Sequence, residues 1–331
     1  MNLKKFKLFS LIKEDIDEVK RMLESVLNER VNAETSPVIK HMLASQGKLL
    51  RPALVFLSAY AVKQNVSEQE KRKLILSATA IELIHMASLV HDDVIDDADI
   101  RRDAKSVKAK FGNPVAVTSG VYLYSVALQL IAEVGSIKIL DELSSTVQKM
   151  CEGELLQYSL RDKTSYDVDL YYSVLESKTA VLFKMACMVG CYLFDIEQKD
   201  QQALADYAMH LGYSFQLSDD YLDMFGDDAD LNKKTGQDFI QGQYTLPVLL
   251  TLKKLDGKEK VAFFDFLDDQ SLTHFEQLKK KAMSLGVQTE LATIVQDRVL
   301  QSKKALESCV DSNYKEALCY LADFVGTRVK V

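Results

Sequence analysis

Apolar residues recur every three or four positions along most of the chain, which is the spacing of one face of an α-helix. The stretch IKEDIDEVKRMLESVLNERV, residues 12–31, shows this pattern between charged positions. The same spacing predicts helices at 52–62, 69–95, 114–134, 137–160, 168–193, 201–225 and 243–255, followed by several more toward the C-terminus. No run of alternating apolar and polar residues is long enough to predict a strand. We therefore predict an all-α fold, a single domain over residues 1–331 built as a bundle of roughly ten or more helices.

The composition agrees with long helices around a substantial core. The 331 residues include only 13 glycines and 4 prolines, and 47% are hydrophobic. A net charge of −7, without a basic stripe, argues against nucleic acid as a partner. Five cysteines, an odd number without a CxxC pair, predict reduced thiols.

The sequence predicts a soluble, cytoplasmic protein that is at most peripheral to a membrane. The basic start, MNLKKFKLFSLIKED, has an apolar run that Lys13 interrupts too early for a signal peptide. The most apolar stretch, residues 179–194, contains Lys184 and is shorter than the ~20 residues of a spanning helix.

Two clusters of aspartates with the pattern DDxxD are the main chemical signal. Two like charges about 4 Å apart repel by roughly 4 kcal/mol at an effective dielectric near 20, so a cation is expected among them. Positions i and i+4 share a helix face, and hard cations such as Mg²⁺ prefer carboxylate oxygens. One such cluster alone is more often a solvated helix end, but two copies, each ending an apolar helix and followed by basic residues, favour metal sites. The candidate metal ligands are Asp92, Asp93, Asp96, Asp219, Asp220 and Asp223.

Basic residues near these clusters could bind a diphosphate. Arg101 and Arg102 follow the first cluster, and Lys233 follows the second. In GKLLRP, Lys48 and Arg51 are one turn apart at the start of a predicted helix. Each of these last two, taken singly, is more often a solvated surface charge.

Two further side chains allow both a functional and a structural interpretation. Lys178 lies in the apolar stretch ESKTAVLF, where it is either a ligand-binding group or a lysine that extends to solvent. His85 belongs to no zinc-binding pattern, and taken alone it is more often a hydrogen-bonded core histidine.

Six motifs together resemble the trans-isoprenyl (polyprenyl) diphosphate synthases, most closely the catalytic subunit of heptaprenyl diphosphate synthase and the medium- to long-chain branch. The resemblance is strong over residues 40–250 and implies an isoprenoid synthase fold, a helical bundle around a central cavity with the two DDxxD motifs facing each other. The motifs, in the order of that family, are GKLLRP, ELIHMASLVHDDVIDDADIRR, CEGELLQ, ESKTAVLF, FQLSDDYLDMF and GQDFIQGQYTLP.

The resemblance also implies a reaction and a role for each candidate residue. A Mg²⁺-dependent prenyltransferase would ionise an allylic diphosphate, such as farnesyl diphosphate, and add isopentenyl diphosphate to the resulting carbocation. The six aspartates would hold about three Mg²⁺ ions. The allylic diphosphate would be bound by Arg101, Lys178 and Lys233, with Thr179 and Gln216 near the developing cation. The pocket for isopentenyl diphosphate would comprise Lys48, Arg51, His85 and Arg102, with Phe215 alongside.

Small residues before the first DDxxD motif bear on product length. Ala87 and Ser88 lie one turn before Asp92, where bulky side chains would close the cavity, and Ile84 could form a lower floor. The alternative is ordinary close helix packing at these positions. The resemblance implies an all-trans product longer than C20, about C30 to C40.

Four positions differ from the family pattern. Asp103 replaces a usual glycine, Val121 an aspartate, Asn232 a glycine, and Gln243 a lysine. The differences leave open a partner-dependent or non-catalytic subunit of a heteromeric synthase, and the chain could form a homodimer or a heterodimer with a small helper subunit. A class I terpene cyclase fits less well, because cyclases generally keep a single DDxxD motif and have no isopentenyl pocket. A long apolar product would also imply transient membrane contact.

Overall fold

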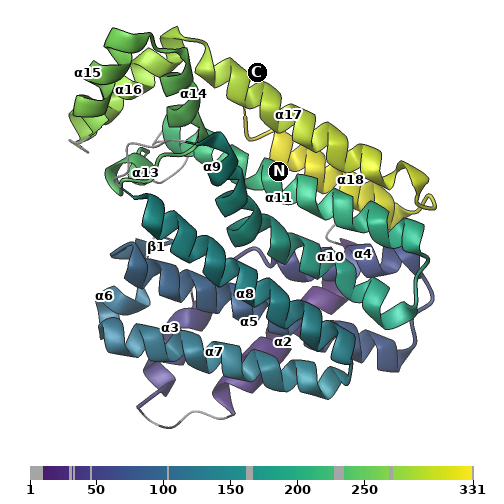
Figure 1. The fold of residues 1–331 in the computed structure, drawn as a ribbon. Helices are drawn as coiled ribbons and strands as arrows, with labels where there is room; N and C mark the ends of the chain where they lie inside the picture. The colour runs from purple at the N-terminus through teal and green to yellow at the C-terminus, as the bar shows by residue number, and fades with distance from the viewer. Residues whose placement is uncertain are drawn as a thin grey trace. The chain divides into compact units, whose positions relative to one another are not determined.

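The computed structural model of the chain describes residues 10–29, 32, 34–44, 47–102, 104–161, 167–226, 235–267 and 271–329. Helices form nearly all of the regular structure in these residues (Figure 1). The only strands among them are β1 (Ile100–Arg101) and β2 (Ala104–Lys105), which pair antiparallel in a small hairpin. The predicted all-α fold is confirmed.

The helices group into two compact units, each built from segments that are distant in sequence. Unit 1 comprises Met1–Val147, Met185–Leu204 and Ser308–Leu318. Unit 2 comprises Gln148–Lys184, Ala205–Glu307 and Cys319–Val331. The helices with residues in both units are α8 (Ile137–Leu160), α10 (Val181–Phe194), α11 (Gln198–Phe225) and α18 (Asn313–Gly326). The single domain over 1–331 stays a prediction.

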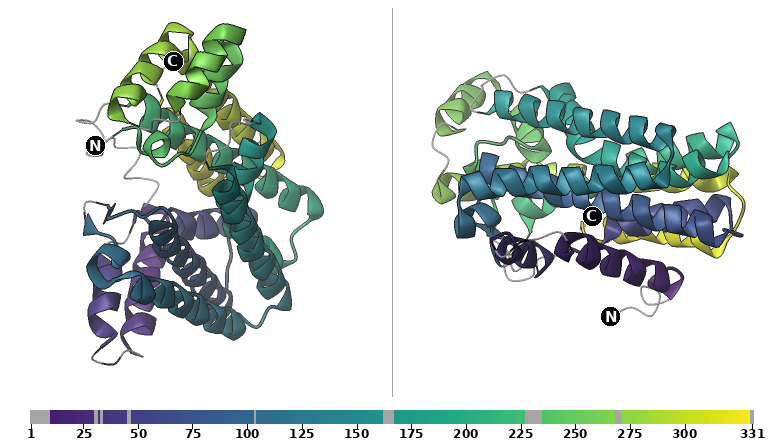
Figure 2. Two further views of the ribbon diagram at one scale, coloured as in Figure 1. Left: turned by 60° about the vertical axis from the view of Figure 1, so that its left-hand side comes forward. Right: turned by 90° about the horizontal axis from the view of Figure 1, so that it is seen from below.

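Unit 1 is organised around a long helix that ends at the first aspartate cluster. This helix, α5, begins with a capping box in which Ser67 and Glu70 each bond the other's backbone N–H. It lies beside α7 (Figures 1 and 2), and Gly120 permits the close approach, because a Cβ there would lie 2.1 Å from His91 Nε2. The helices lying wholly in this unit are α2 (Lys13–Asn28), α3 (Ser36–Ala44), α4 (Leu50–Val62), α5 (Glu68–Ile95), α6 (Val107–Phe111) and α7 (Asn113–Val134).

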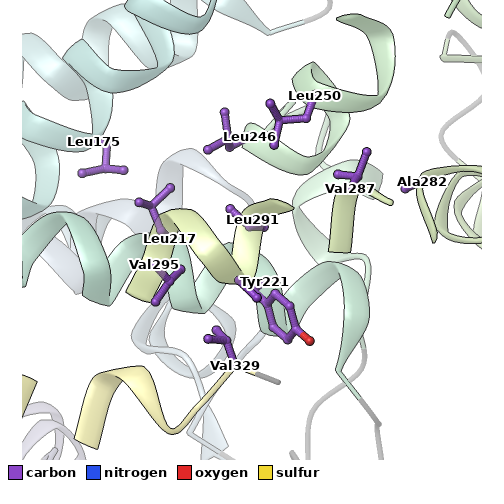
Figure 3. Close-up of a cluster of buried hydrophobic side chains, with 11 residues drawn as sticks. Leu175, Leu217, Tyr221, Leu246, Leu250, Ala282, Val287, Leu291, Val295 and Val329 are labelled. Atoms are coloured by element: carbon purple, nitrogen blue, oxygen red, sulfur yellow. The ribbon is translucent and has the colours of Figure 1, made fainter. Parts of the chain in front are cut away.

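Unit 2 has its own apolar core, to which α11 contributes Leu217 and Tyr221. Figure 3 shows these side chains among leucines and valines from neighbouring helices, including Leu246 and Leu291. The elements lying in this unit are α9 (Val168–Leu175), the π-helix η1 (Glu176–Ala180), α13 (Gln237–Ile240), α14 (Leu246–Lys254), α15 (Gly257–Leu267), α16 (Leu272–Ser284) and α17 (Val287–Ala305). The 3₁₀ turn η2 (Leu306–Ser308) continues α17, and its last residue belongs to unit 1.

The predicted helices agree with the structure except in one place. The helices expected at 69–95, 114–134, 137–160 and 201–225 correspond to α5, α7, α8 and α11. The single helix expected at 168–193 is instead interrupted by η1, where the backbone hydrogen bonds shift by one residue. Residue-type periodicity does not report such a local change in register.

In the part of the chain that the structure describes, three helical stretches could cross a membrane by length and composition alone, whereas the sequence led us to expect none. They are Glu68–Ile95, Asn113–Val134 and Val168–Phe194. The structure buries 78% and 61% of the apolar windows of the first and third, so their composition is explained by core packing. The window on α7 is 39% buried and leaves Val117, Val121 and Leu128 exposed.

Candidate functional site

The first aspartate cluster lies at the C-terminal end of α5, in unit 1. Asp93 is only 3% exposed, and Arg101 of β1 pairs with its Oδ1 through Nε at 2.8 Å and Nη2 at 2.7 Å. Burial raises the pKa of the Asp93 carboxyl, and the Arg101 charge opposes that rise. The hairpin thus places Arg101, predicted to bind diphosphate, against Asp93, predicted to bind metal. Asp92 and Asp96, on either side of Asp93 in the sequence, are partly exposed.

A lysine that the sequence did not single out neutralises the rest of this acidic run. The side chain of Lys108, on α6, is 6% exposed and pairs with Asp97 and, at 3.3 Å, with Asp99. Local sequence does not reveal this pairing, because it depends on the fold-back through the hairpin. Asp97 and Asp99 therefore stabilise the loop after α5 through Lys108, and in this role they differ from the candidate metal ligands.

Three of the four residues predicted to bind isopentenyl diphosphate gather around a buried acid in unit 1. The charges of Arg51 and Arg102 act on both His85 and Glu82, and Glu82 is 3% exposed. Burial lowers the pKa of His85 well below its usual range, and the arginine charges lower it further, so the imidazole is neutral near pH 7. Lys48 is exposed close by in sequence.

Glu82 was missed by the sequence reasoning, although its position one turn before His85 on the same helix was a usable signal. Burial raises the pKa of Glu82, and the two arginines lower it. The Arg102 guanidinium rests against Gly47, where a Cβ would lie 2.6 Å from Nη2. The glycine of GKLLRP thus leaves room for a cation.

The predicted chain-length residues lie on the same helix. Ala87 and Ile84 are buried, at 0% and 2% exposure, and Ser88 is partly exposed. The Ser88 hydroxyl donates to the His85 carbonyl at 2.9 Å. A role in product length stays a prediction.

The second aspartate cluster lies near the C-terminal end of α11, in unit 2, and Asp220 is its buried member. Asp220 accepts hydrogen bonds from the Tyr171 hydroxyl at 2.5 Å and from Gln216 Nε2 at 3.0 Å. Burial raises the pKa of Asp220 to about 7, and the two hydrogen bonds oppose the rise. Tyr171 is a site residue that the sequence did not suggest.

Asp219 is paired with an arginine from near the end of the chain. Arg328 bonds the Asp219 carboxylate, donates to Ser218 Oγ at 2.9 Å and lies 5.1 Å from the centre of the Phe215 ring. Arg328 was also missed, because it is 109 residues from its partner. The ring of Phe215, predicted beside the isopentenyl pocket, thus makes a cation–π contact with the Arg328 guanidinium.

The third aspartate of this cluster fixes the turn at the start of α13. Asp223 accepts from the backbone N–H groups of Gln237 and Asp238 at 3.1 and 3.2 Å. Gly236, with φ +78°, begins this turn, and a Cβ there would meet the Phe275 ring at 2.7 Å. Only glycine meets both requirements.

The π-helix η1 carries two of the predicted ligands, Lys178 and Thr179. Thr179 Oγ1 donates to Gln216 Oε1 at 3.0 Å, so the polar groups predicted near the developing cation are linked through Gln216 to Asp220. Lys178 donates to Gln157 Oε1 at 2.5 Å and pairs with Glu154, both on α8. Single-turn π-segments are frequent at functional sites.

Some predicted positions lie outside the described residues. These are Lys233, Asp103 and Asn232. Of the other two departures from the family pattern, Val121 is 58% exposed on α7, and Gln243 accepts from Gln157 Nε2 at 2.6 Å.

The donors at both clusters suit a hard cation. All six candidate ligands are carboxylates, and Mg²⁺ commonly takes one or two protein carboxylates with water and substrate phosphate completing its shell. Among the described residues no three His, Cys, Asp or Glu side chains lie close enough together to hold an ion. Any bound Mg²⁺ would therefore depend on other ligands as well as these aspartates.

Comparisons with known proteins agree with the motifs. A family model described as polyprenyl synthetase matches residues 32–285. Heptaprenyl diphosphate synthase component 2 of Bacillus subtilis (strain 168) is 31% identical over 98% of this chain and 91% of its own. Its namesake in Geobacillus stearothermophilus is 35% identical over 77% and 78%.

Solved structures show the same fold. A polyprenyl synthase from Caulobacter crescentus CB15 aligns with a TM-score of 0.89 and 29% identity over 98% of this chain and 97% of that chain. A heptaprenyl diphosphate synthase from Staphylococcus aureus aligns with a TM-score of 0.86 and 27% identity over 96% and 99%. The resemblance found in the sequence is confirmed.

Proposed function

Because the chain belongs to the polyprenyl synthetase family, we propose that it condenses isopentenyl diphosphate with an allylic diphosphate, such as farnesyl diphosphate, into an all-trans product longer than C20, about C30 to C40. As a trans-polyprenyl diphosphate synthase it is a prenyltransferase of isoprenoid biosynthesis. The single observation that carries the proposal is the clustering of Arg51, His85 and Arg102 in unit 1. A terpene cyclase needs no such pocket.

Binding of the allylic substrate is assigned to residues of both aspartate motifs. Mg²⁺, held by Asp92, Asp93, Asp96, Asp219, Asp220 and Asp223, would withdraw charge from the diphosphate as its C–O bond ionises. Arg101 and Lys178 bind the same diphosphate, and Lys233 is assigned there from the motif. The Thr179 hydroxyl and the Gln216 amide, 3.0 Å apart, present oxygen dipoles to the allylic cation.

The isopentenyl substrate is bound by side chains that do not themselves change protonation. Arg51, Arg102 and Lys48 supply fixed positive charge for its diphosphate, and neutral His85 supplies one donor and one acceptor. The proton lost after the new carbon–carbon bond forms passes to the released diphosphate. No protein nucleophile is needed.

A second candidate is a synthase subunit that needs a partner. The observation in its favour is the apolar face of α7, where Val117, Val121 and Leu128 are 46%, 58% and 50% exposed. The word "component" in the names of two relatives also supports a partner. We propose either a homodimer or a heterodimer with a small helper subunit, in the cytoplasm, with transient membrane contact when the product leaves.

The test is to incubate the purified chain with farnesyl diphosphate, labelled isopentenyl diphosphate and Mg²⁺. The product is extracted, dephosphorylated and sized by reversed-phase chromatography, and the mass of the enzyme in solution is measured by light scattering. A ladder that ends at about six to eight isoprene units supports the proposal. No incorporation by a folded chain supports the partner-dependent subunit instead.

A further inference from the structure

Gln243, at a position where the family usually has lysine, belongs to a chain of hydrogen bonds that begins at Lys178. Lys178 Nζ donates to Gln157 Oε1 at 2.5 Å, and Gln157 Nε2 donates to Gln243 Oε1 at 2.6 Å. Gln243 Nε2 lies 3.5 Å from Gln241 Oε1. All four residues belong to unit 2.

The direction of this chain is fixed by chemistry. An ammonium group has three donors and no acceptor, so Gln157 must present its oxygen to Lys178, and the NH₂ group of the same amide then faces Gln243. Gln243 must therefore accept. A lysine at position 243 could not accept, so the Gln157 NH₂ group would lose its partner and a second ammonium group would lie beside the amide that holds Lys178. Glutamine at 243 is thus the matched partner of Gln157.

Lys178 is also held from a second direction. Its ammonium pairs with the Glu154 carboxylate, and the two side chains are 21% and 15% exposed. Gly153 brings α8 against η1, because a Cβ there would lie 2.6 Å from Ser177 Cβ and 3.2 Å from Lys178 Cγ. Both the aliphatic part of the Lys178 side chain and its ammonium group are therefore held in place by α8.

We infer that Gln157 and Gln243 are positioning residues that orient Lys178 toward the allylic diphosphate. Among the described residues, Gln157 accepts a hydrogen bond from the ammonium group and Glu154 forms an ion pair with it, and a further N–H of the ammonium group would donate to a phosphate oxygen. The inference rests on the proposed role of Lys178. In this interpretation Gln243 does not supply the positive charge of the family lysine. It instead orients the positive charge of Lys178 through Gln157.

The test is Gln243→Lys, with Leu155→Lys as the control that adds the same charge at a 70% exposed position of α8, two residues from Gln157. Loss of one oriented charge-assisted hydrogen bond should raise the KM for farnesyl diphosphate about tenfold. The KM for isopentenyl diphosphate and kcat should stay within about twofold, as should all constants of the control. Gln243→Met, which has no comparable acceptor, should give the same selective rise and adds no charge.

The double variant Gln157→Glu with Gln243→Lys should restore the wild-type KM to within about threefold. The new carboxylate accepts from both ammonium groups, so Lys178 regains its partner. A purely structural loss would not be rescued by two charged substitutions. Thermal unfolding midpoints show whether each variant is folded.

The inference is overturned if Gln243→Lys lowers or does not change the KM for farnesyl diphosphate, because position 243 would then act as a direct ligand or have no role. Calorimetric titration with farnesyl thiodiphosphate and Mg²⁺ measures binding of the same variants without turnover. If the wild-type chain does not condense, the proposed function fails or needs a partner, and these dissociation constants still decide the inference.

Discussion

At the residue scale, the pocket around Glu82 shows how burial sets the charge of a binding site. Glu82 and His85 are one turn apart on α5 and share the charges of Arg51 and Arg102. The histidine is neutral, so the positive charge in the pocket comes from the arginines and does not vary near pH 7. The binding of an anionic substrate there is therefore insensitive to small changes in pH.

The low pKa of His85 lowers the free energy of unfolding in acid. Because the folded-state pKa lies well below the ordinary value of 6.5, the unfolded chain binds a proton that the folded chain does not, and stability falls as the pH drops below 6.5. His85→Gln should remove about 1.4 kcal/mol of the loss in unfolding free energy between about pH 7.5 and pH 5.5. Urea unfolding at the two pH values measures it, and equal losses in wild type and variant would contradict the prediction.

Ala87 allows a residue-scale prediction about the product. Its methyl group is fully buried on α5, so Ala87→Phe places a ring where the proposed cavity continues. We expect the largest product to shorten by at least one isoprene unit, seen by chromatography of the dephosphorylated products. Ser88→Thr, a small change on the adjacent position, is the control. An unchanged ladder with Ala87→Phe would exclude this turn as a floor.

At the element scale, helix pairs are brought together by glycines at their contact points. Gly190 of α10 faces Ala59 of α4, and a Cβ there would lie 2.6 Å from the Ala59 Cα. Backbone cannot move away as a flexible side chain can, so these helices must separate to admit a methyl group. Gly212 meets Ala180 in the same way within unit 2, at 2.7 Å.

Gly190→Ala should therefore destabilise the protein by about 1–2 kcal/mol. Overpacking costs about 1–3 kcal/mol, and the gain in helix propensity offsets up to about 1 kcal/mol. Gly257→Ala is the control, because no atom lies within 4 Å of a Cβ at this exposed first position of α15. Thermal unfolding midpoints compare the two, and a destabilisation no larger than that of the control would refute the packing explanation.

The elements and the candidate ligands could be predicted to different extents from the sequence. The apolar period of α5 and the DDxxD spacing are local, so both were visible. The partners Tyr171 and Arg328 were not visible, because they reach α11 from 49 and 109 residues away. The π-helix at Lys178 also escaped, because a one-residue shift in hydrogen bonding leaves residue spacing almost unchanged.

At the scale of the whole molecule, substrate and metal should stabilise the fold together. A ligand that binds only the folded state at 100 times its dissociation constant adds about 2.7 kcal/mol to the free energy of unfolding. We expect a rise of several degrees in the thermal midpoint with farnesyl thiodiphosphate and Mg²⁺, and its loss with EDTA. Asp92→Asn should reduce the rise, whereas Asp323→Asn, which removes an exposed partner of Lys303, should not. A rise that persists in EDTA would contradict Mg²⁺ dependence.

The discontinuous make-up of the two units has a consequence for synthesis on the ribosome. Unit 1 includes residues 308–318 and unit 2 includes residues 319–331, so neither unit is complete before the last part of the chain has been made. Apolar helices such as α4 and α5 leave the ribosome before the later segments of unit 1 have been made, so their apolar faces stay exposed during that time. Nascent chains of this protein should therefore depend on chaperones that shield apolar surface until residues 308–331 have been made.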